Sequence, residues 1–413
     1  MEQNNSMVGS HSTGKIATDK IFGANQLAVD AVQKFGRENV TNATIGAILD
    51  DNEALVVLPT VEKVLRSLPA AELAAYAPIA GLPDYQEAAI ELTFLGNKPD
   101  AYLQAIATPG GSGAIRNTVW TYSEVGDTIL TTDWFWGPYR TMCEENLRKL
   151  ATFDFFTEGE GFNLQSLETK AKNLLDKQRN LVVLLNTPAH NPTGYSLSNE
   201  EWIKTIDLFK ELAMNKAKKI IVFVDVAYLD YAGEKQAVRS FMRLFSGLPE
   251  NILIVFGFSA SKGFTMYGQR TGAMIAVTSS KAVAEEFRNT NELACRGTWS
   301  NCTRSGQRLL ATICRDQELL AQVEVEREQW RGKIEARAAT FMQEANQVGL
   351  KTVPYKAGFF ITVPAADPDA IVAKLNEKML FAVALGKGVR LAICSIPDQK
   401  VSGMAAKIIE AQK

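Results

Sequence analysis

Short, nearly continuous apolar runs separated by amphipathic stretches mark the middle of the chain. Because both faces of each run are apolar, the pattern predicts strands that are covered on both sides. Two amphipathic helices are predicted among them, at Leu164–Lys177 and Glu200–Asn215. Strand–helix alternation of this kind predicts an α/β domain with a mainly parallel sheet. The predicted strands are Tyr102–Thr108, Thr128–Thr132, Asn180–Leu185, Lys219–Val226, Ile252–Phe256 and Ala273–Val277.

The two ends of the chain follow a different pattern. From about Ser305 to Val348 the sequence is helical, rich in charges and free of proline, and short strands and the segment Ile371–Glu377 follow. We expect Asp19–Phe35 and roughly Gln322–Lys413 to form a smaller second domain together. The expected domain limits are 16–50 and 322–413 for this small domain and 51–321 for the large one. The first 15 residues are predicted to be disordered because they are polar.

Composition and charge narrow the classes of function. The 413 residues carry a net charge of −2, with a pI near 6.0, which favours neither nucleic acid nor an anionic membrane as a partner. The longest apolar run, Ile220–Ala227, is broken by Asp225, and the polar N-terminus lacks the apolar stretch of a signal peptide. Five scattered cysteines without a CxxC pair suit a reducing compartment, so we expect a cytoplasmic protein. Because the only histidines are His11 and His190, we predict no metal site.

One apparent nucleotide motif lies near the N-terminus. The segment Gly9–Lys15 has the GxxxxGK spacing of a phosphate-binding loop. Ile16 follows where that motif requires Ser or Thr for magnesium, and no strand precedes the segment. We therefore interpret Gly9–Lys15 as part of a flexible tail.

Three segments place polar residues at the ends of predicted strands, where open α/β sheets bind ligands. Thr108–Ala114 is a glycine-rich turn between a strand and a helix, which suits an anion, although a tight turn alone would also explain it. Pro188–Gly194 contains Asn-Pro-Thr-Gly, whose simplest explanation is a loop. Val224–Tyr228 places Asp225 at the end of the most apolar strand, where a carboxylate is costly unless it meets a cation or a donor.

A fourth segment adds a lysine and an arginine. Lys262, in Ser259–Gly263, follows an apolar strand, so we expect it near the interior, where a lowered pKa makes lysine a nucleophile for carbonyls. A surface lysine is the alternative. The segment Gly268–Gly272 follows and contains Arg270. Together, an anion cradle, a buried Asp, hydrogen-bonding Asn and Tyr side chains and a reactive Lys are the groups that pyridoxal phosphate requires.

In their order and spacing these segments resemble the class I aminotransferases of the aspartate and aromatic amino acid type, within the fold-type I pyridoxal phosphate enzymes. The resemblance extends from about Asn42 to Asp398. It implies an α/β fold with a mainly parallel seven-stranded sheet flanked by helices, and a smaller α+β domain built from both chain ends. The segments that carry it are Tyr76–Tyr85 (YAPIAGLPDY), Thr108–Arg116 (TPGGSGAIR), Asn191–Gly194 (NPTG), Ser259–Lys262 with Tyr267–Gly272, and Val389–Leu391.

The resemblance also implies how pyridoxal 5'-phosphate would be held. Lys262 would form the Schiff base and shuttle the Cα proton, and Asp225 would pair with the pyridinium nitrogen. Asn191 and Tyr228 would hydrogen-bond the phenolate oxygen of the ring, and Trp136 would stack on it. The residues that would bind the phosphate are Gly110, Gly111, Ser112, Ser259 and Arg270, with Tyr76 reaching it from the other subunit.

Two further arginines would bind the substrate. Arg390, assisted by the Gly46 backbone, would grip the α-carboxylate with a bidentate fork, and Trp136 and Asn191 would also contact the substrate. Arg296 stands where related enzymes read a distal carboxylate across the dimer. For each arginine, a surface ion pair is the alternative.

Three departures from the family pattern affect these implications. Tyr139 stands where aspartate-type enzymes often carry a histidine, which leaves the hydrogen-bond support of Asp225 open. Gln269 replaces the common Glu before Arg270, and Ala47–Leu49 lacks the usual Tyr-Lys. These changes weaken any transfer of substrate preference.

The sequence therefore predicts a pyridoxal phosphate-dependent aminotransferase with a ping-pong mechanism. Its amino donor would be aspartate, an aromatic amino acid or both, and its acceptor a 2-oxo acid such as 2-oxoglutarate. The resemblance implies a homodimer with shared active sites and no nucleic-acid or membrane partner. Alternatives on the same fold are a C–S lyase or β-decarboxylase and, least favoured, a cofactor-binding transcription regulator, because the few residues before Ile45 are not basic.

Overall fold

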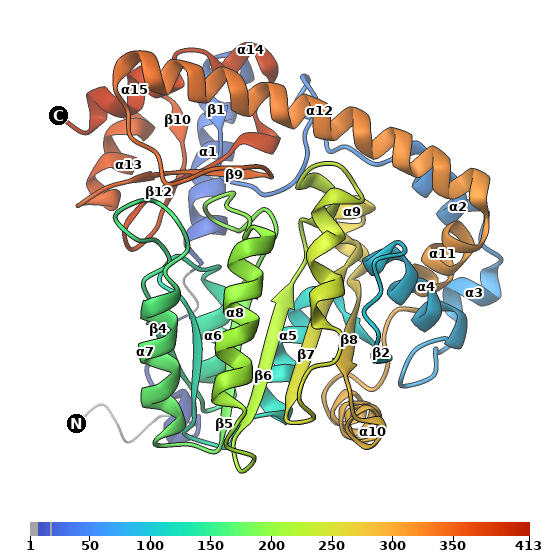
Figure 1. Ribbon diagram of the computed structural model, residues 1–413. Coiled ribbons are helices and arrows are strands. Elements are labelled where there is room, and N and C mark those ends of the chain that lie inside the picture. Colours follow the sequence, from blue (N-terminus) through green and yellow to red (C-terminus); the bar gives the residue numbers. More distant parts are fainter. Residues whose placement is uncertain (1–6, 17–18) are drawn as a thin grey trace.

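A mainly parallel sheet of seven strands forms the centre of the protein, for which the computed structural model describes residues 7–16 and 19–413 (Figure 1). Five strands run parallel in neighbouring positions, and β8 is antiparallel to both of its neighbours. The predicted fold class is confirmed. In spatial order the strands are β2 (Tyr102–Pro109), β8 (Thr271–Thr278), β7 (Ile252–Ser259), β6 (Lys219–Asp225), β5 (Asn180–Asn186), β3 (Thr128–Thr132) and β4 (Lys149–Phe153).

Six of these strands coincide with the predicted apolar runs to within a few residues. The seventh strand, β4, was not predicted. It lies at the sheet edge and is only partly buried, so its residues are not continuously apolar. On β5, Val183 and Leu185 pack into the core on one face while Val182 and Leu184 pack on the other. Burial of both faces explains why the run has no polar alternation.

Helices cover both faces of the sheet (Figure 1). One face packs against α5 (Gly110–Thr121), α6 (Pro138–Glu145) and α10 (Lys281–Thr298). The core on the other face includes residues of α2 (Pro59–Ser67), α4 (Pro83–Phe94), α7 (Leu164–Leu175), α8 (Asn199–Leu212) and α11 (Arg304–Arg315). The short helix α3 (Ala70–Ala74) lies between α2 and α4 in sequence.

The two chain ends meet in a second hydrophobic core beside the sheet. In the N-terminal segment, α1 (Lys20–Phe35) is followed by β1 (Thr41–Asn42), which pairs in parallel with β10 (Leu380–Phe381). The expected association of the two ends therefore occurs, while the expected domain limits stay a prediction. The other elements of this part are α12 (Gln317–Val348), β9 (Phe360–Pro364), α13 (Pro368–Glu377), β11 (Val383–Ala384), β12 (Gly388–Ala392), α14 (Asp398–Val401) and α15 (Met404–Ala411).

The long helical stretch predicted near residues 305–348 consists of two helices. Asp316 separates α11 from α12, and its side chain accepts hydrogen bonds from the backbone N–H groups of Glu318 and Leu319. An N-cap of this kind starts a new helix without proline or glycine.

The expected disordered tail lies partly outside the described residues. Within them, Ser10–Ser12 forms a 3-10 turn, and Lys15 Nζ lies 2.6 Å from Glu145 Oε1. In the part of the chain that the structure describes, no helix is both long and apolar enough to cross a membrane.

Candidate active site

A cavity of about 410 Å³ opens at the carboxyl edge of the parallel strands, where the sheet meets the part of the protein built from the chain ends. Strands β5, β6 and β7 end there side by side, because Asn186 is in register with Asp225, and Asp225 with Gly257. Ser259 closes β7, and α9 (Ala260–Gly263) begins directly after it. Parallel pairing thus brings residues that are far apart in sequence to one edge.

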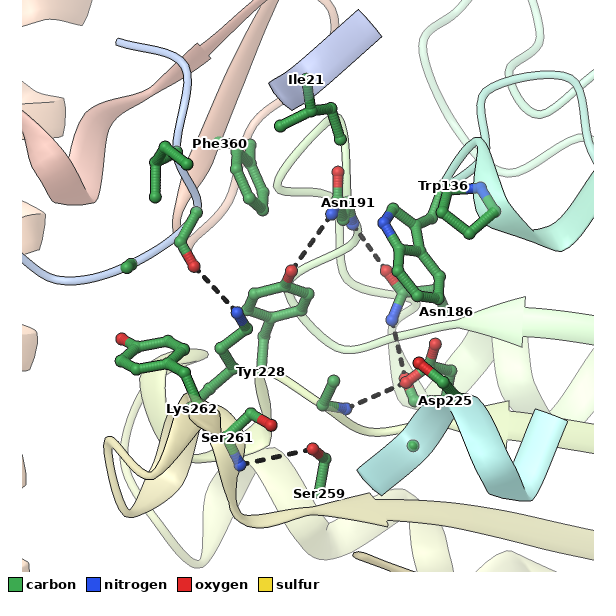
Figure 2. A pocket seen from close by; sticks show the side chains of 18 of the residues that line it. Ile21, Trp136, Asn186, Asn191, Asp225, Tyr228, Ser259, Ser261, Lys262 and Phe360 are labelled. Carbon is green, nitrogen blue, oxygen red and sulfur yellow. Dashed lines mark hydrogen bonds between the residues drawn. The ribbon is translucent and has the colours of Figure 1, made fainter. Parts of the chain in front are cut away.

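Lys262 projects from α9 into this cavity (Figure 2). Its Nζ donates a hydrogen bond to the Gly46 carbonyl oxygen at 2.8 Å and lies 4.6 Å from the ring centroid of Tyr267. Desolvation lowers the pKa of Lys262 to about 8. A neutral amine is therefore accessible near neutral pH, as a nucleophile for carbonyls requires.

Asp225, at the end of β6, is only 5% exposed and accepts two hydrogen bonds. The Tyr139 hydroxyl donates to Oδ2 at 2.6 Å, and the Ala227 backbone N–H donates to Oδ1 at 3.2 Å. Burial raises the pKa of Asp225 to about 6, although these donors favour its ionised form. The support for this carboxylate that the sequence left open is thus a tyrosine hydroxyl.

Arg390, on β12, is a cation buried to 2% exposure. One terminal nitrogen donates to the Thr44 carbonyl at 2.6 Å and the other lies 3.4 Å from Asn191 Oδ1, while Nε has no partner among the described residues. No carboxylate of the described chain forms an ion pair with it, and its guanidinium lies 4.4 Å from the ring centroid of Phe360. A buried, unneutralised guanidinium is costly and is suited to binding an anionic ligand.

The turn between β2 and α5 has the geometry of an anion cradle. Gly110 has φ +69°, and a Cβ added there would lie 2.7 Å from Arg270 Nη2, so the backbone approaches this arginine closely. Gly111, Ser112 and Arg270 line the cavity together with Ser259, whereas Gly110 lies behind them. The first turn of α5 contains no acidic residue and no side-chain cap. Its free N–H groups and helix dipole suit a phosphate.

Comparison with known proteins identifies the family. The family described as aminotransferase class I and II matches residues 38–408. The chain belongs to this family. A solved aminotransferase from Anaerococcus prevotii DSM 20548 is 37% identical, with a TM-score of 0.96 over 99% of this chain and 100% of that one.

More distant relatives of the present chain include aminotransferases whose names state a substrate. The mitochondrial aspartate aminotransferase of Dictyostelium discoideum is 25% identical, covering 74% of this chain and 70% of that protein. The aromatic-amino-acid aminotransferase of Pseudomonas aeruginosa is 24% identical, covering 68% and 69%. A Burkholderia pseudomallei aromatic-amino-acid aminotransferase structure, covalently bound to pyridoxal phosphate, has a TM-score of 0.79 at 21% identity, covering 98% of this chain and 100% of that one, which shows a shared fold.

Pyridoxal phosphate is the cofactor of this aminotransferase, and the cavity fits it. The α5 cradle suits the phosphate, Lys262 suits the aldehyde, and a buried carboxylate suits a protonated ring nitrogen. Asn191 Nδ2 donates to the Tyr228 hydroxyl at 3.1 Å, and both Asn191 and Trp136 line the cavity (Figure 2).

Besides Gly110, two predicted site residues do not line this cavity. Tyr76 is 86% exposed, and Arg296, near the end of α10, donates to Ser300 Oγ at 2.6 Å on the surface. Both residues were predicted to act in the active site of a neighbouring subunit. Their position in a single chain does not test that prediction. Gln269 accepts a hydrogen bond from Ser305, and Ala47 lines the cavity.

Several residues at the cavity were not singled out from the sequence. Asn186 donates to the Asp225 carbonyl at 2.9 Å, and its Oδ1 accepts the Asn191 backbone N–H at 2.6 Å. Asn186 is a polar residue at the end of an apolar run, which is the same pattern that identified Asp225, so the sequence could have indicated it as a site residue. Ile21 and Phe22 of α1 and Phe360 of β9 also line the cavity, and no local pattern distinguishes them from ordinary core residues.

Proposed function

We propose that this aminotransferase moves the amino group of aspartate or an aromatic amino acid to a 2-oxo acid, with 2-oxoglutarate as the acceptor, in two half-reactions. The observation that carries the proposal is that Lys262 and Arg390 line one cavity, and that Arg390 is a buried arginine without a carboxylate partner among the described residues. An amino acid whose α-carboxylate binds Arg390 presents its amino group and Cα toward the lysine side of the cavity.

Residues of this chain would bind the substrate and move its Cα proton. Arg390 binds the α-carboxylate of each substrate and so orients Cα. Lys262, whose pKa of about 8 leaves a fraction of the amine neutral near neutral pH, would remove the proton from Cα of the amino donor and, in the second half-reaction, deliver a proton to Cα of the acceptor. When bound, pyridoxal phosphate supplies a ring that accepts the electrons released at Cα.

The cofactor itself would be held from three sides. Asp225 keeps the ring nitrogen protonated, while Asn191 and Tyr228 hydrogen-bond the ring oxygen and Trp136 covers its face. Gly110, Gly111, Ser112, Ser259 and Arg270 would bind the phosphate, and Tyr76 of a second copy would complete this cradle.

The substrate side chain would meet a largely apolar wall. Ile21, Leu55 and Phe360 line the cavity and suit an aromatic side chain. Among the described residues that line it, Lys262, Arg270 and Arg390 are the cations, and each already has a proposed role. A distal carboxylate would need a further cation, for which we propose Arg296 of a second copy in a homodimer.

The proposed compartment is the cytoplasm. All five cysteines are free, which suits a reducing environment, and a cytoplasmic aspartate aminotransferase from Dictyostelium discoideum is 27% identical over 68% of this chain. Mitochondrial relatives match as well. Fractionation of the source cells tests the proposal, and recovery of the activity in an organelle fraction would contradict it.

Replacement of the lysine tests the reaction. Lys262→Ala should still bind pyridoxal phosphate through the phosphate and ring contacts. It should lose turnover by at least the 10²–10⁴-fold that a general acid–base typically contributes. Lys281→Ala, at an exposed lysine on α10, is the matched control and should behave as the parent protein.

The assay follows the 2-oxo acid formed from aspartate or phenylalanine together with the glutamate formed from 2-oxoglutarate. A one-to-one yield supports transamination. Pyruvate formed without an acceptor would instead indicate a lyase or β-decarboxylase, and a Lys262→Ala protein that turns over normally would overturn the assignment of the lysine.

Subunit mixing tests the shared site. A hybrid of Lys262→Ala and Arg296→Ala subunits contains one site that lacks both groups and one that has both. Activity toward aspartate should reappear in the hybrid. If hybrids form and no activity returns, Arg296 does not act across the interface.

A further inference from the structure

The turn that leads into α6 carries two aromatic side chains in contact, one of which lines the cavity. Trp136, just before the helix, lines the cavity, and Tyr139 lies one turn later with its backbone N–H bonded to the Trp136 carbonyl at 2.9 Å. Their rings meet edge to face, with centroids 5.8 Å apart. The two side chains are therefore fixed relative to each other.

Tyr139 is buried to 1% exposure, and its hydroxyl has one hydrogen-bond partner among the described residues, Asp225 Oδ2 at 2.6 Å. Burial and the neighbouring carboxylate raise the pKa of Tyr139 well above its usual range. The phenol therefore stays protonated throughout the working pH range, and its proton points at the carboxylate. A core tyrosine that served packing alone would not need this geometry, as Tyr85 and Tyr231 illustrate with buried hydroxyls that have no partner.

The carboxylate of Asp225 depends on few groups. Tyr139 from α6 and the Ala227 N–H donate to it directly, and Lys262 from α9 acts on it through its charge. The nearby Tyr228 hydroxyl is neutral at working pH, because burial raises its pKa well above the usual range. Asn186 contacts the backbone carbonyl and not the carboxylate. Tyr139 is thus the one side-chain hydroxyl bonded to the Asp225 carboxylate in the described chain.

We propose that Tyr139 is a positioning residue that orients the Asp225 carboxylate and favours its ionised form, so that the carboxylate meets the protonated ring nitrogen of the cofactor. Because Tyr139 and Trp136 belong to one hydrogen-bonded turn at the start of α6, that turn would position the groups that meet both the ring nitrogen and the ring face of the cofactor. The inference rests on the role of Asp225 in the proposed function.

Binding of pyridoxamine phosphate to the apoprotein tests this role without turnover, because this probe forms no Schiff base. Tyr139→Phe keeps the ring and removes the donor. It should weaken binding about tenfold to a hundredfold near pH 7, the factor expected for a hydrogen bond to a charged group. The acid limb of the affinity profile should also move to higher pH, because the carboxylate protonates more easily without its donor.

Two further variants separate donation from packing. Tyr139→His restores a donor while changing the ring, and should bind the probe more tightly than Tyr139→Phe above the imidazole pKa. Tyr122→Phe removes a hydroxyl that bonds to Asn291, away from the cavity, and should leave affinity unchanged.

Either of two results would overturn the role of Tyr139. One is a Tyr139→Phe protein that binds the probe as the parent does at every pH. The other is a loss of affinity that is equal at every pH and is not relieved in Tyr139→His, since packing alone would explain it. Asp225→Ala distinguishes this failure from that of the proposed function, because normal binding by Asp225→Ala would refute the role of the carboxylate itself.

Discussion

The buried carboxylate of Asp225 should make the apoprotein less stable than it would be with a neutral side chain. In Asp225→Asn the Asn carbonyl can accept the Ala227 N–H, and the Tyr139 hydroxyl can rotate to accept a hydrogen bond from the new amide. The substitution therefore removes the charge with little change in volume, but the Tyr139 O–H proton loses its acceptor, which makes the gain worked out from the pKa an upper limit. We expect Asp225→Asn to stabilise the apoprotein at neutral pH while abolishing turnover.

The magnitude follows from the pKa of Asp225, which burial raises from an ordinary 3.8 to about 6. Because the folded-state pKa lies above the unfolded one, the protonated carboxyl favours folding below pH 3.8, and that stability is lost as pH rises through 6. The gap of about two pH units corresponds to roughly 3 kcal/mol at 1.36 kcal/mol per unit. Relative to the parent protein, Asp225→Asn should thus gain about 3 kcal/mol in the free energy of unfolding at pH 8. At pH 5 the gain should be about half of that, because the parent has then lost only part of the stability that its protonated carboxyl provides.

Urea unfolding of the two apoproteins at equal concentration, followed by tryptophan fluorescence at pH 5 and pH 8, measures these differences. Asp100→Asn, at an exposed aspartate, is the control and should show no pH-dependent gain. The reasoning is refuted if Asp225→Asn is less stable than the parent at pH 8, or if its gain is the same at both pH values.

Two other substitutions test the specificity and the support of the site. Arg296→Leu should lower kcat/KM for aspartate about 10²-fold, since a charge-assisted contact contributes about 2–4 kcal/mol. The kcat/KM for phenylalanine should be much less affected. Equal losses for the two substrates would mean that Arg296 shapes the dimer instead. Gly263→Ala would place a Cβ 2.1 Å from Asp230 Oδ2, a partly buried carboxylate paired with Arg239 and Arg327. It should cost about 1–3 kcal/mol in thermal unfolding, whereas Gly297→Ala, with open space around it, should cost nothing.

The central sheet and the cofactor could be predicted because the evidence for them is local. A strand buried on both faces is apolar at every position, so β5 and β6 are visible in a single chain. The edge strand β4 is partly exposed and was missed for the same reason. Asp225 ends such a strand and Lys262 lies in the short helix that follows another, so their position at the sheet edge could be inferred from chain order alone.

The walls of the cavity depend on contacts between distant segments. The hydrogen bond from Arg390 to Thr44 spans 346 residues, and that from Tyr139 to Asp225 spans 86. Ile21 reaches the cavity only because β1 pairs with β10 and holds the N-terminal segment beside the C-terminal one. Local sequence patterns record which residues are buried or follow a strand. They do not record which partner a buried donor meets, because that depends on how the two chain ends pack against the sheet.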